Sequence, residues 1–233
     1  MEQVLPASSP ASFPWRGGCE KITIIAVMPN SAPASRCLAV VTARKGSKGV
    51  PGKNVMPLLG QPAITHTLRL ALGIREIDRV VVSTDCPRAA RAAKQAGVEV
   101  IPRPAALARD RSPITDALRH AVRVLEARGE RYGIVLLLYA NIPYRRPEIV
   151  QKSVRRMRTG KWDSVLSLCP VGNFHPQWVY RLEKGKVVPY EPTVIFRRQD
   201  LPPVFAHTGA CVALRTRVLL ASEGAPDPNA FLG

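Results

Sequence analysis

The sequence has few of the residues that build redox or metal centres. Its 233 residues include five cysteines and four histidines, and no two cysteines form a C-x-x-C pair. Pairs of that spacing are typical of zinc and thiol-exchange sites, so their absence argues against both classes. An odd number of widely spaced cysteines also argues against a disulfide framework, and we expect a reduced, cytoplasmic protein.

Long apolar runs are also absent. No segment reaches the ~20 apolar residues that a membrane span needs, so no membrane partner is expected. The run Ile-Thr-Ile-Ile-Ala-Val-Met at 22–28 is short and lacks the basic lead-in of a signal peptide. Residues 1–36 as a whole are rich in Pro and Ser without periodicity, which predicts a disordered leader.

Acidic residues are outnumbered: 17 stand against 34 basic residues, which gives a net charge of +17. Such a balance would suggest a nucleic-acid partner. No long block of Lys and Arg stands out and no nucleic-acid reader motif is present, so nucleic acid is not the expected partner. A hydrophobic content of 46% over this length favours one folded domain with a real core.

From residue 37 onward, short β-branched runs alternate with amphipathic segments. The predicted strands are 37–43, 79–85, 98–104, 133–139, 164–171 and 210–215, and the predicted helices are 63–74, 87–97, 114–129 and 147–160. Strands separated by helices imply right-handed crossovers and a mostly parallel sheet with helices on both faces. The sequence therefore predicts a three-layer, Rossmann-like α/β domain over 37–220, followed by a flexible tail at 221–233.

The loop after the first of these strands is cationic and rich in glycine. The stretch Ala-Arg-Lys-Gly-Ser-Lys-Gly-Val-Pro-Gly-Lys-Asn, residues 43–54, holds four cations and three glycines. Binding crevices of open α/β sheets lie at the carboxyl ends of the strands, where this loop is expected. The stretch matches neither G-x-x-x-x-G-K-[ST] nor G-x-G-x-x-G. A solvated turn is the alternative, but the pattern favours a phosphate site.

Four segments in the same order resemble motifs of the CMP-sialic acid synthetases, also called N-acylneuraminate cytidylyltransferases. The first is the loop 43–54, and the others are Val-Val-Val-Ser-Thr-Asp at 80–85, the R-P-x-x-L-A-x-D segment within 97–118, and the R-Q-x-L-P and Gly-Ala segment within 197–214. The resemblance covers about 38–214. It implies the nucleotide-diphospho-sugar transferase-like fold.

The activity implied by the resemblance is transfer of CMP from CTP to a 2-keto sugar acid, with release of pyrophosphate and with Mg²⁺ as cofactor. In this reading Arg44 and Lys48 are catalytic, because they hold the phosphates. The residues that the resemblance assigns to the nucleotide are Ala43, Arg44, Gly46, Ser47, Lys48, Asn54, Asp85, Arg103 and Ser112. For Arg103, the alternative without the resemblance is an ordinary surface arginine.

The resemblance also assigns residues to the sugar acid: Tyr139, Asn141, Arg145, Gln199, His207, Thr208 and Gly209. Tyr139 departs from the family pattern, where many members have Gln, and His207 and Thr208 also differ from the usual residues. Exchanging an amide for a phenol changes the hydrogen-bond inventory, so the acceptor is expected to differ from sialic acid. Packing at a strand end is the alternative for Tyr139.

The family's D-x-D pair, which binds Mg²⁺ downstream of the Gly-Ala segment, has no counterpart here. The chain ends in Pro-Asp-Pro-Asn-Ala-Phe-Leu-Gly, where Asp227 is isolated. Two oxygen ligands are roughly the minimum for a protein-bound Mg²⁺, so the metal ligands are unknown and truncation is expected.

Two other functions stay open at this point. One is another sugar nucleotidyltransferase on the same fold, for instance one that acts on an octulosonic acid. The other is a catalytically impaired protein that binds nucleotide or nucleic acid. A homodimer is an open alternative for the assembly.

Overall fold

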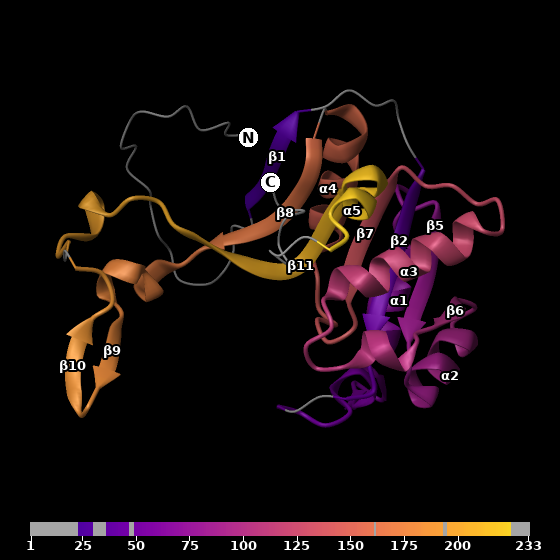
Figure 1. The fold of residues 1–233 in the computed structure, drawn as a ribbon, viewed down its shortest axis with the longest axis horizontal. Helices are drawn as coiled ribbons and strands as arrows, with labels where there is room; N and C mark the ends of the chain where they lie inside the picture. Colours follow the sequence, from indigo (N-terminus) through magenta and orange to yellow (C-terminus); the bar gives the residue numbers. More distant parts are fainter. Residues whose placement is uncertain (1–22, 30–35, 47–48, 161, 193–194, 225–233) are drawn as a thin grey trace. The chain divides into compact units, whose positions relative to one another are not determined.

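A computed structural model describes residues 23–29, 36–46, 49–160, 162–192 and 195–224 (Figure 1). Their contacts divide them into two compact units, a smaller one at 169–206 and a larger one that holds the other described residues. The sequence had predicted one domain over 37–220. The smaller unit lies within that range, and its grouping rests on contacts that periodicity along the chain does not report.

A seven-stranded sheet forms the centre of the larger unit, with the strand order β1-β8-β11-β7-β2-β5-β6. The strands are β1 (Thr23–Pro29), β2 (Cys37–Ala43), β5 (Arg79–Thr84), β6 (Glu99–Pro102), β7 (Ile134–Tyr139), β8 (Trp162–Pro170) and β11 (Phe205–Arg215). β7, β2, β5 and β6 pair in parallel. Every residue of β2 is buried, as expected for a parallel strand that is covered on both faces.

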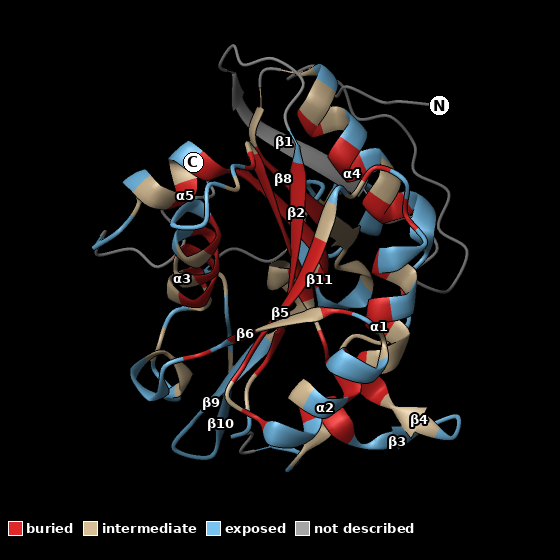
Figure 2. Ribbon diagram, turned by 90° about the vertical axis from the view of Figure 1, so that its right-hand side faces the viewer, coloured by how far each residue is buried: buried red, intermediate tan, exposed pale blue. Residues whose placement is uncertain are grey.

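Helices cover both faces of this sheet. Figure 2 shows α3 (Ile114–Glu126) and α5 (Thr216–Ala221) on one face, and α1 (Ala63–Leu72), α2 (Pro87–Gln95) and α4 (Pro147–Thr159) on the other. α3 buries Leu118, Ala121, Val122 and Leu125, spaced along one helical face, against the sheet. The predicted three-layer α/β fold with a mostly parallel sheet is confirmed.

The half of the sheet that contains β1, β8 and β11 includes antiparallel pairs, which the sequence did not predict. β11 pairs antiparallel with β7, and β1 pairs antiparallel with β8. β1 lies inside the segment for which disorder was predicted, so the leader prediction is corrected for Thr23–Pro29. Their β-branched apolar run finds a partner strand in β8, more than 130 residues later, which local composition does not reveal.

Two small hairpins complete the strands. In the larger unit β3 (Pro57–Leu58) pairs with β4 (Gln61–Pro62), and in the smaller unit β9 (Tyr180–Glu183) pairs with β10 (Lys186–Pro189). Short 3₁₀ turns lie between the strands and helices, namely η1 (Lys53–Val55), η2 (Ala105–Ala108), η3 (Gly172–Phe174), η4 (Pro176–Trp178) and η5 (Arg198–Asp200).

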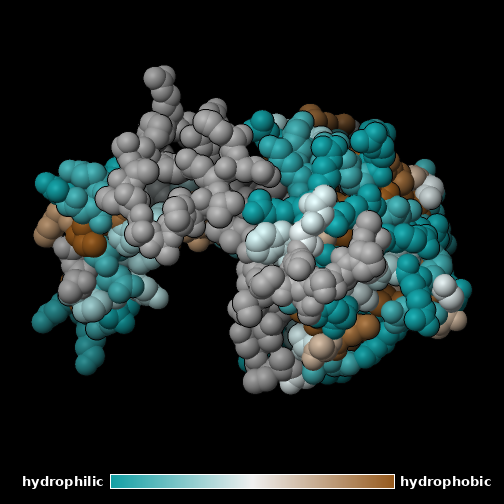
Figure 3. Space-filling model, turned by 90° about the horizontal axis from the view of Figure 1, so that it is seen from above, coloured by the Kyte–Doolittle hydropathy of each residue, from teal (hydrophilic) through white to brown (hydrophobic). Residues whose placement is uncertain are grey.

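The exposed surface reflects the charged composition of the chain. Hydrophilic side chains cover most of the described surface seen in Figure 3.

In the predicted tail, Ala221 ends α5 and Glu223 forms an ion pair with Arg123, while 225–233 lie outside the described residues. None of the helices in the described segments is long and apolar enough to cross a membrane.

Glu99 on the edge strand β6 is expected to make part of the stability dependent on pH. It pairs with Arg128 and with Arg79, and these hydrogen bonds hold the pKa of Glu99 below its ordinary value. Because the folded pKa is depressed, the stabilisation is present above the unfolded value of about 4.3 and is lost as the pH falls through the folded value.

We therefore expect Glu99→Gln to remove about 1 kcal/mol or less at neutral pH, since the pairs are partly exposed. The loss should vanish towards pH 3 or so. Urea unfolding between these pH values measures it, with Glu148→Gln as the control, because Glu148 is exposed and forms no ion pair in the described part of the chain. A loss of stability that is independent of pH would contradict the ionic origin.

Candidate functional site

The loop after β2 closes back on itself through Asn54. Gly52, at φ +66°, turns the chain into η1, and Asn54 is 5% exposed. Its amide Nδ2 donates to the carbonyl oxygen of Arg44 at 3.0 Å. Its Oδ1 is buried and has no hydrogen-bond partner among the described residues. Since buried acceptors are normally paired, this oxygen indicates a missing donor.

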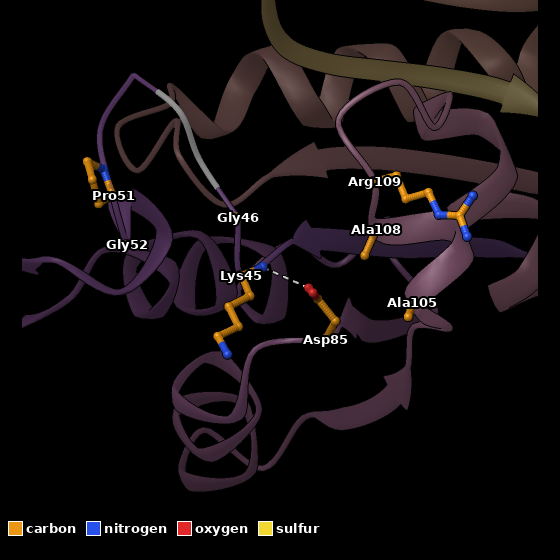
Figure 4. A pocket seen from close by; sticks show the side chains of 8 residues that line it. All are labelled: Lys45, Gly46, Pro51, Gly52, Asp85, Ala105, Ala108 and Arg109. Atoms are coloured by element: carbon orange, nitrogen blue, oxygen red, sulfur yellow. Dashed lines mark hydrogen bonds between the residues drawn. The ribbon is translucent and has the colours of Figure 1, made fainter.

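One cavity lies beside this loop and is called the loop cavity. It has a volume of about 510 Å³ and is lined by Lys45, Gly46, Pro51, Gly52, Asp85, Ala105, Ala108 and Arg109 (Figure 4). The backbone N–H of Lys45 donates to Oδ1 of Asp85 at 2.7 Å. This bond joins the segments that follow β2 and β5, so both strands contribute to the cavity at their carboxyl ends.

A second cavity, called the sheet-edge cavity, has a volume of about 390 Å³. It is lined by Thr42, Arg44, Lys53, Asn54, Arg103, Ile114, Tyr139, Asn141, Ile142, His207, Thr208 and Gly209. Residues predicted for the nucleotide and residues predicted for the sugar acid therefore line one cavity. The volume lies within the range of small-molecule sites, roughly 300–1,000 Å³.

Arg103 is 6% exposed, and its position excludes the reading as an ordinary surface arginine. Its Nε donates to Oγ of Ser83 at 3.2 Å, and its Nη2 donates to the Ser83 carbonyl at 2.9 Å. Burial lowers the pKa of Arg103, the charge of Asp85 partly offsets this, and Arg44 lowers the pKa further. No carboxylate forms an ion pair with Arg103 among the described residues. Since an unpaired buried cation is costly, a bound anion would stabilise this site.

Arg44 also lines the sheet-edge cavity and is only partly exposed. Its Nη1 lies 2.7 Å from Oδ1 of Asp110, and the exposed fractions of the two side chains are 32% and 43%. Ion pairs with this much solvent contact are weak, so a phosphate group can compete with Asp110 for Arg44. The residues Arg44, Arg103 and Asn54 thus all line the sheet-edge cavity.

β7 and β11 contribute Tyr139, His207, Thr208 and Gly209 to the sheet-edge cavity. Gly209 has φ +69°, and a Cβ atom there would lie 2.9 Å from Cδ1 of Ile142 and 3.7 Å from Cδ2 of Tyr139. Glycine is therefore required on both conformational and steric grounds. Burial raises the pKa of Tyr139, so its phenol stays protonated and can donate a hydrogen bond into the cavity.

Arg145 does not line either cavity, although the sequence assigned it to the sugar acid. It is 5% exposed, and its Nε donates to the Ala210 carbonyl at 2.6 Å, while Nη1 donates to Oγ1 of Thr67 at 3.0 Å. Nη2 donates to the carbonyl of Tyr139. Burial lowers the pKa of Arg145 to about 10. Arg145 therefore helps to position β7 and β11, whose residues line the sheet-edge cavity.

The remaining predicted residues are more scattered. Ala43 ends β2 and accepts at its carbonyl a hydrogen bond from Oγ1 of Thr84, and Ser112 Oγ donates to the carbonyl of Ala106 at 2.8 Å. Gln199 belongs to η5 in the smaller unit and lines neither cavity. Ser47 and Lys48 lie outside the described residues.

Sequence reasoning missed the apolar residues Ile114 and Ile142, and also Arg109, all of which line the cavities. An isoleucine after a strand or at a helix start has no pattern that separates a cavity wall from core packing. It also missed His120, whose Nδ1 is buried without a described partner and whose pKa is lowered by burial and by Arg103. The proximity to Arg103 arises only on folding.

The described residues include no group of three His, Cys, Asp or Glu side chains that could hold a metal ion. Asp85 and Asp110 flank the cationic loop, but the first accepts the Lys45 N–H and the second pairs with Arg44. These carboxylates do not fit a preformed Mg²⁺ site, and we derive no step through the metal.

Comparison with known proteins agrees with this geometry. The sequence model of the family described as cytidylyltransferase matches residues 38–218, and the chain therefore belongs to the cytidylyltransferase family.

Individual relatives narrow the comparison. The chain is 36% identical over 159 residues to a CMP-N,N'-diacetyllegionaminic acid synthase from Legionella pneumophila, covering 66% of each protein. It is 27% identical to an N-acylneuraminate cytidylyltransferase from Escherichia coli, over 58% of this chain and 31% of the relative. A pseudaminic acid cytidylyltransferase from Campylobacter jejuni is 29% identical over 51% of this chain and 52% of the relative. The chain thus spans about a third to two thirds of the length of these relatives.

Solved structures support the fold. The structure of a CMP:2-keto-3-deoxy-manno-octonic acid synthetase complexed with CTP covers 84% of this chain and 81% of its own, with a TM-score of 0.60 at 24% identity. A 4-diphosphocytidyl-2C-methyl-D-erythritol synthase gives the same TM-score at 13% identity. The predicted nucleotidyltransferase-like fold is confirmed by both.

Proposed function

We propose that this chain is a cytidylyltransferase that transfers CMP from CTP to a nonulosonic sugar acid and releases pyrophosphate. The observation that carries this proposal is the sheet-edge cavity, which is lined by the buried cation Arg103 and by Asn54, whose buried oxygen has no hydrogen-bond partner among the described residues. An anion would stabilise the buried guanidinium of Arg103, and a hydrogen-bond donor would satisfy the buried Oδ1 of Asn54. A nucleotide offers both on one molecule.

The chemistry needs fixed positive charge more than it needs a nucleophilic side chain. The anomeric hydroxyl oxygen of the sugar acid forms a bond to the α-phosphorus of CTP, the bond from that phosphorus to the pyrophosphate oxygen breaks, and the hydroxyl proton leaves to solvent. Arg44 and Arg103 stabilise the charge on the transferring phosphoryl group, because their guanidinium groups are held before substrate arrives. That Lys48 binds the phosphates stays a prediction.

Asn54 orients the nucleotide in this proposal. Its Nδ2 is engaged by the Arg44 carbonyl, which leaves Oδ1 as an acceptor for an amino or hydroxyl group of CTP. The same bond ties the side chain to the residue that holds phosphate. Mg²⁺ stays part of the proposal as an ion that accompanies the triphosphate of CTP, with no ligands assigned in this chain.

We propose a nonulosonic acid as the acceptor because the relatives named above act on legionaminic, pseudaminic and sialic acids. The alternative is an octulosonic acid, as in the CTP-bound synthetase that shares the fold. Tyr139 and Ile142 can contact apolar substituents of the acceptor, while Asn141, His207 and Thr208 offer hydrogen-bond partners for its hydroxyl groups.

Pyrophosphate release tests the proposal. The protein is incubated with CTP, Mg²⁺ and a panel of sialic, legionaminic, pseudaminic and octulosonic acids. We expect release that depends on one of the nonulosonic acids and stops when CTP is replaced by ATP. Release with the octulosonic acid alone would favour the alternative acceptor, and binding of CTP without release would show the impaired protein.

Tyr139 is expected to set acceptor preference. We expect Tyr139→Gln to change the ratio of kcat/KM between two acceptors by about 10-fold or more and to leave the affinity for CTP unchanged. The reason is that Tyr139 carries no positive charge, whereas the phosphates of CTP are expected to bind Arg44 and Arg103. Titration with CTP and assays on each acceptor measure the two effects. A loss of both together would show that Tyr139 acts only in packing.

We also propose that the protein forms a homodimer in the cytoplasm through its smaller unit. The hairpin β9-β10 exposes Leu182 and Val187 at 80% and 65%, and a lone two-stranded hairpin is marginally stable in water. We expect Leu182→Ser with Val187→Ser to shift the mass in light scattering from dimer to monomer. An unchanged dimer, or a monomeric parent protein, would contradict this assembly.

A further inference from the structure

One surface of the larger unit combines exposed cations with exposed leucines, and the proposed reaction uses neither. It is called the α2 surface and comprises the exposed residues Met56, Leu58, Leu59, Arg69, Leu72, Arg88, Arg91 and Lys94. They belong to the segment that holds β3 and β4, to α1 and to α2. Figure 2 shows these elements together at one end of the sheet face.

The cations of α2 form one stripe. Arg88, Arg91 and Lys94 are spaced by three residues and lie on the exposed side of the helix, while its alanines Ala89, Ala92 and Ala93 are buried. α2 contains no acidic residue, and neither does α1, with which it is in contact. The surface therefore has no carboxylate of its own on these two helices.

Ion pairs engage arginines on both faces of the sheet, since Arg155 and Arg158 of α4 pair with Glu76 and Asp78 on the face that α1 and α2 cover. On the face of α3 and α5, Arg123, Arg128 and Arg217 pair with Glu223, Glu99 and Asp163. Within the described part of the chain, no ion pair engages Arg69, Arg88, Arg91 or Lys94. The α2 surface thus carries exposed cations that no described carboxylate neutralises.

The β3-β4 hairpin adds an apolar tip to the stripe. Leu59 is 87% exposed, with Leu58 beside it and Met56 at 46%. Leu59 adopts φ +48°, a left-handed conformation that non-glycine residues rarely occupy. The hairpin is fastened to the helices, because His66 Nε2 lies 2.8 Å from the Leu58 carbonyl and Arg88 Nη2 reaches the Val55 carbonyl at 3.5 Å.

We propose that the α2 surface binds peripherally to a membrane that contains anionic phospholipid. The cations complement the headgroup phosphates, and Leu58 and Leu59 enter the boundary between headgroups and acyl chains. Nucleic acid fits less well, because single strands are held by aromatic stacking and this surface has no aromatic residue. The sequence alone had led us to expect no membrane partner, since that expectation rested on the lack of spanning segments.

Co-sedimentation with vesicles tests the proposal at physiological ionic strength. One set of vesicles is phosphatidylcholine, and the other is an equal mixture of phosphatidylcholine and phosphatidylglycerol. We expect the protein to bind the mixed vesicles and not the neutral ones. Each cation near an anionic surface contributes roughly 5-fold to partitioning, so Arg88→Gln, Arg91→Gln and Lys94→Gln together should lower it by about 100-fold.

A matched triple variant removes the same charge from the other face, namely Arg123→Gln, Arg128→Gln and Arg217→Gln. It should keep most of the binding. The pair Leu58→Ser and Leu59→Gly tests the tip, and we expect it to lower partitioning by roughly 10-fold. Glycine accepts the left-handed conformation at position 59, so the hairpin is preserved.

Three results would overturn the proposal. Equal losses in the two triple variants would show attraction by net charge alone. Binding that the leucine pair does not change, and that a short RNA removes completely, would show a polyanion site. Failure of the protein to bind the mixed vesicles would exclude a membrane role directly. Thermal midpoints and CTP titrations of all variants verify that fold and cavity are intact.

Discussion

Replacing Arg145 by methionine should lower the free energy of unfolding by about 2 to 5 kcal/mol. The guanidinium joins three separate segments, because it donates to Ala210, to Thr67 and to the carbonyl of Tyr139. Methionine fills a similar volume but donates nothing, so three buried acceptors lose a donor. Each buried acceptor left without a partner costs roughly 1 to 3 kcal/mol, less what solvent or relaxation restores.

Urea unfolding measures this change, with Arg146→Met as the matched control. Arg146 is the next residue and is exposed, so its replacement should alter stability by about 0.5 kcal/mol or less. The CTP affinity of folded Arg145→Met should change less than its stability. A stability equal to that of the parent, together with a selective loss of acceptor turnover, would instead support the sugar-acid role that the sequence predicted.

Arg103→Met should weaken CTP binding by about 10- to 150-fold, the range for losing a hydrogen bond to a charged group. Arg103 is buried, has no described carboxylate partner and is oriented by both oxygen atoms of Ser83. The bound nucleotide supplies the opposite charge, so the variant loses an interaction that solvent cannot replace. Stability should change less than affinity, because a buried cation is itself costly without its ligand.

Calorimetric titration with CTP tests this prediction, and Arg111→Met serves as the control, since Arg111 is exposed and lines neither cavity. The parent and the control should bind CTP alike. Equal affinity in Arg103→Met would place the triphosphate elsewhere, with the loop cavity beside Lys45 and Arg109 as the next site to consider.

The parts of the fold that could be predicted are those that depend on contiguous residues. The buried run at β7 and the helical spacing in α3 are properties of contiguous residues, so both elements were predicted correctly. The pairing of β1 with β8 and the separation of 169–206 depend on contacts between distant residues. No periodicity along the chain encodes such contacts.

The same distinction holds for the site. The cationic glycine-rich loop predicted nucleotide roles for Arg44 and Asn54, because charge and glycine spacing are visible in the sequence, and both residues line the sheet-edge cavity. Arg145 was assigned to the sugar acid, whereas its three donors contact protein atoms, since a sequence does not show which way a buried arginine points. Ile142 was not predicted at all, although it forms the wall that requires glycine at 209.

Titration with nucleotides tests whether the sheet-edge cavity holds CTP. The parent protein is titrated with CTP, ATP, GTP and a short RNA under one set of conditions, and Arg103→Met is titrated with CTP alongside. We expect CTP to bind at least about 10-fold more tightly than the others, which corresponds to roughly 1.4 kcal/mol, and Arg103→Met to lose most of that affinity. Equal binding of ATP or RNA, or no binding of CTP, would contradict the assignment.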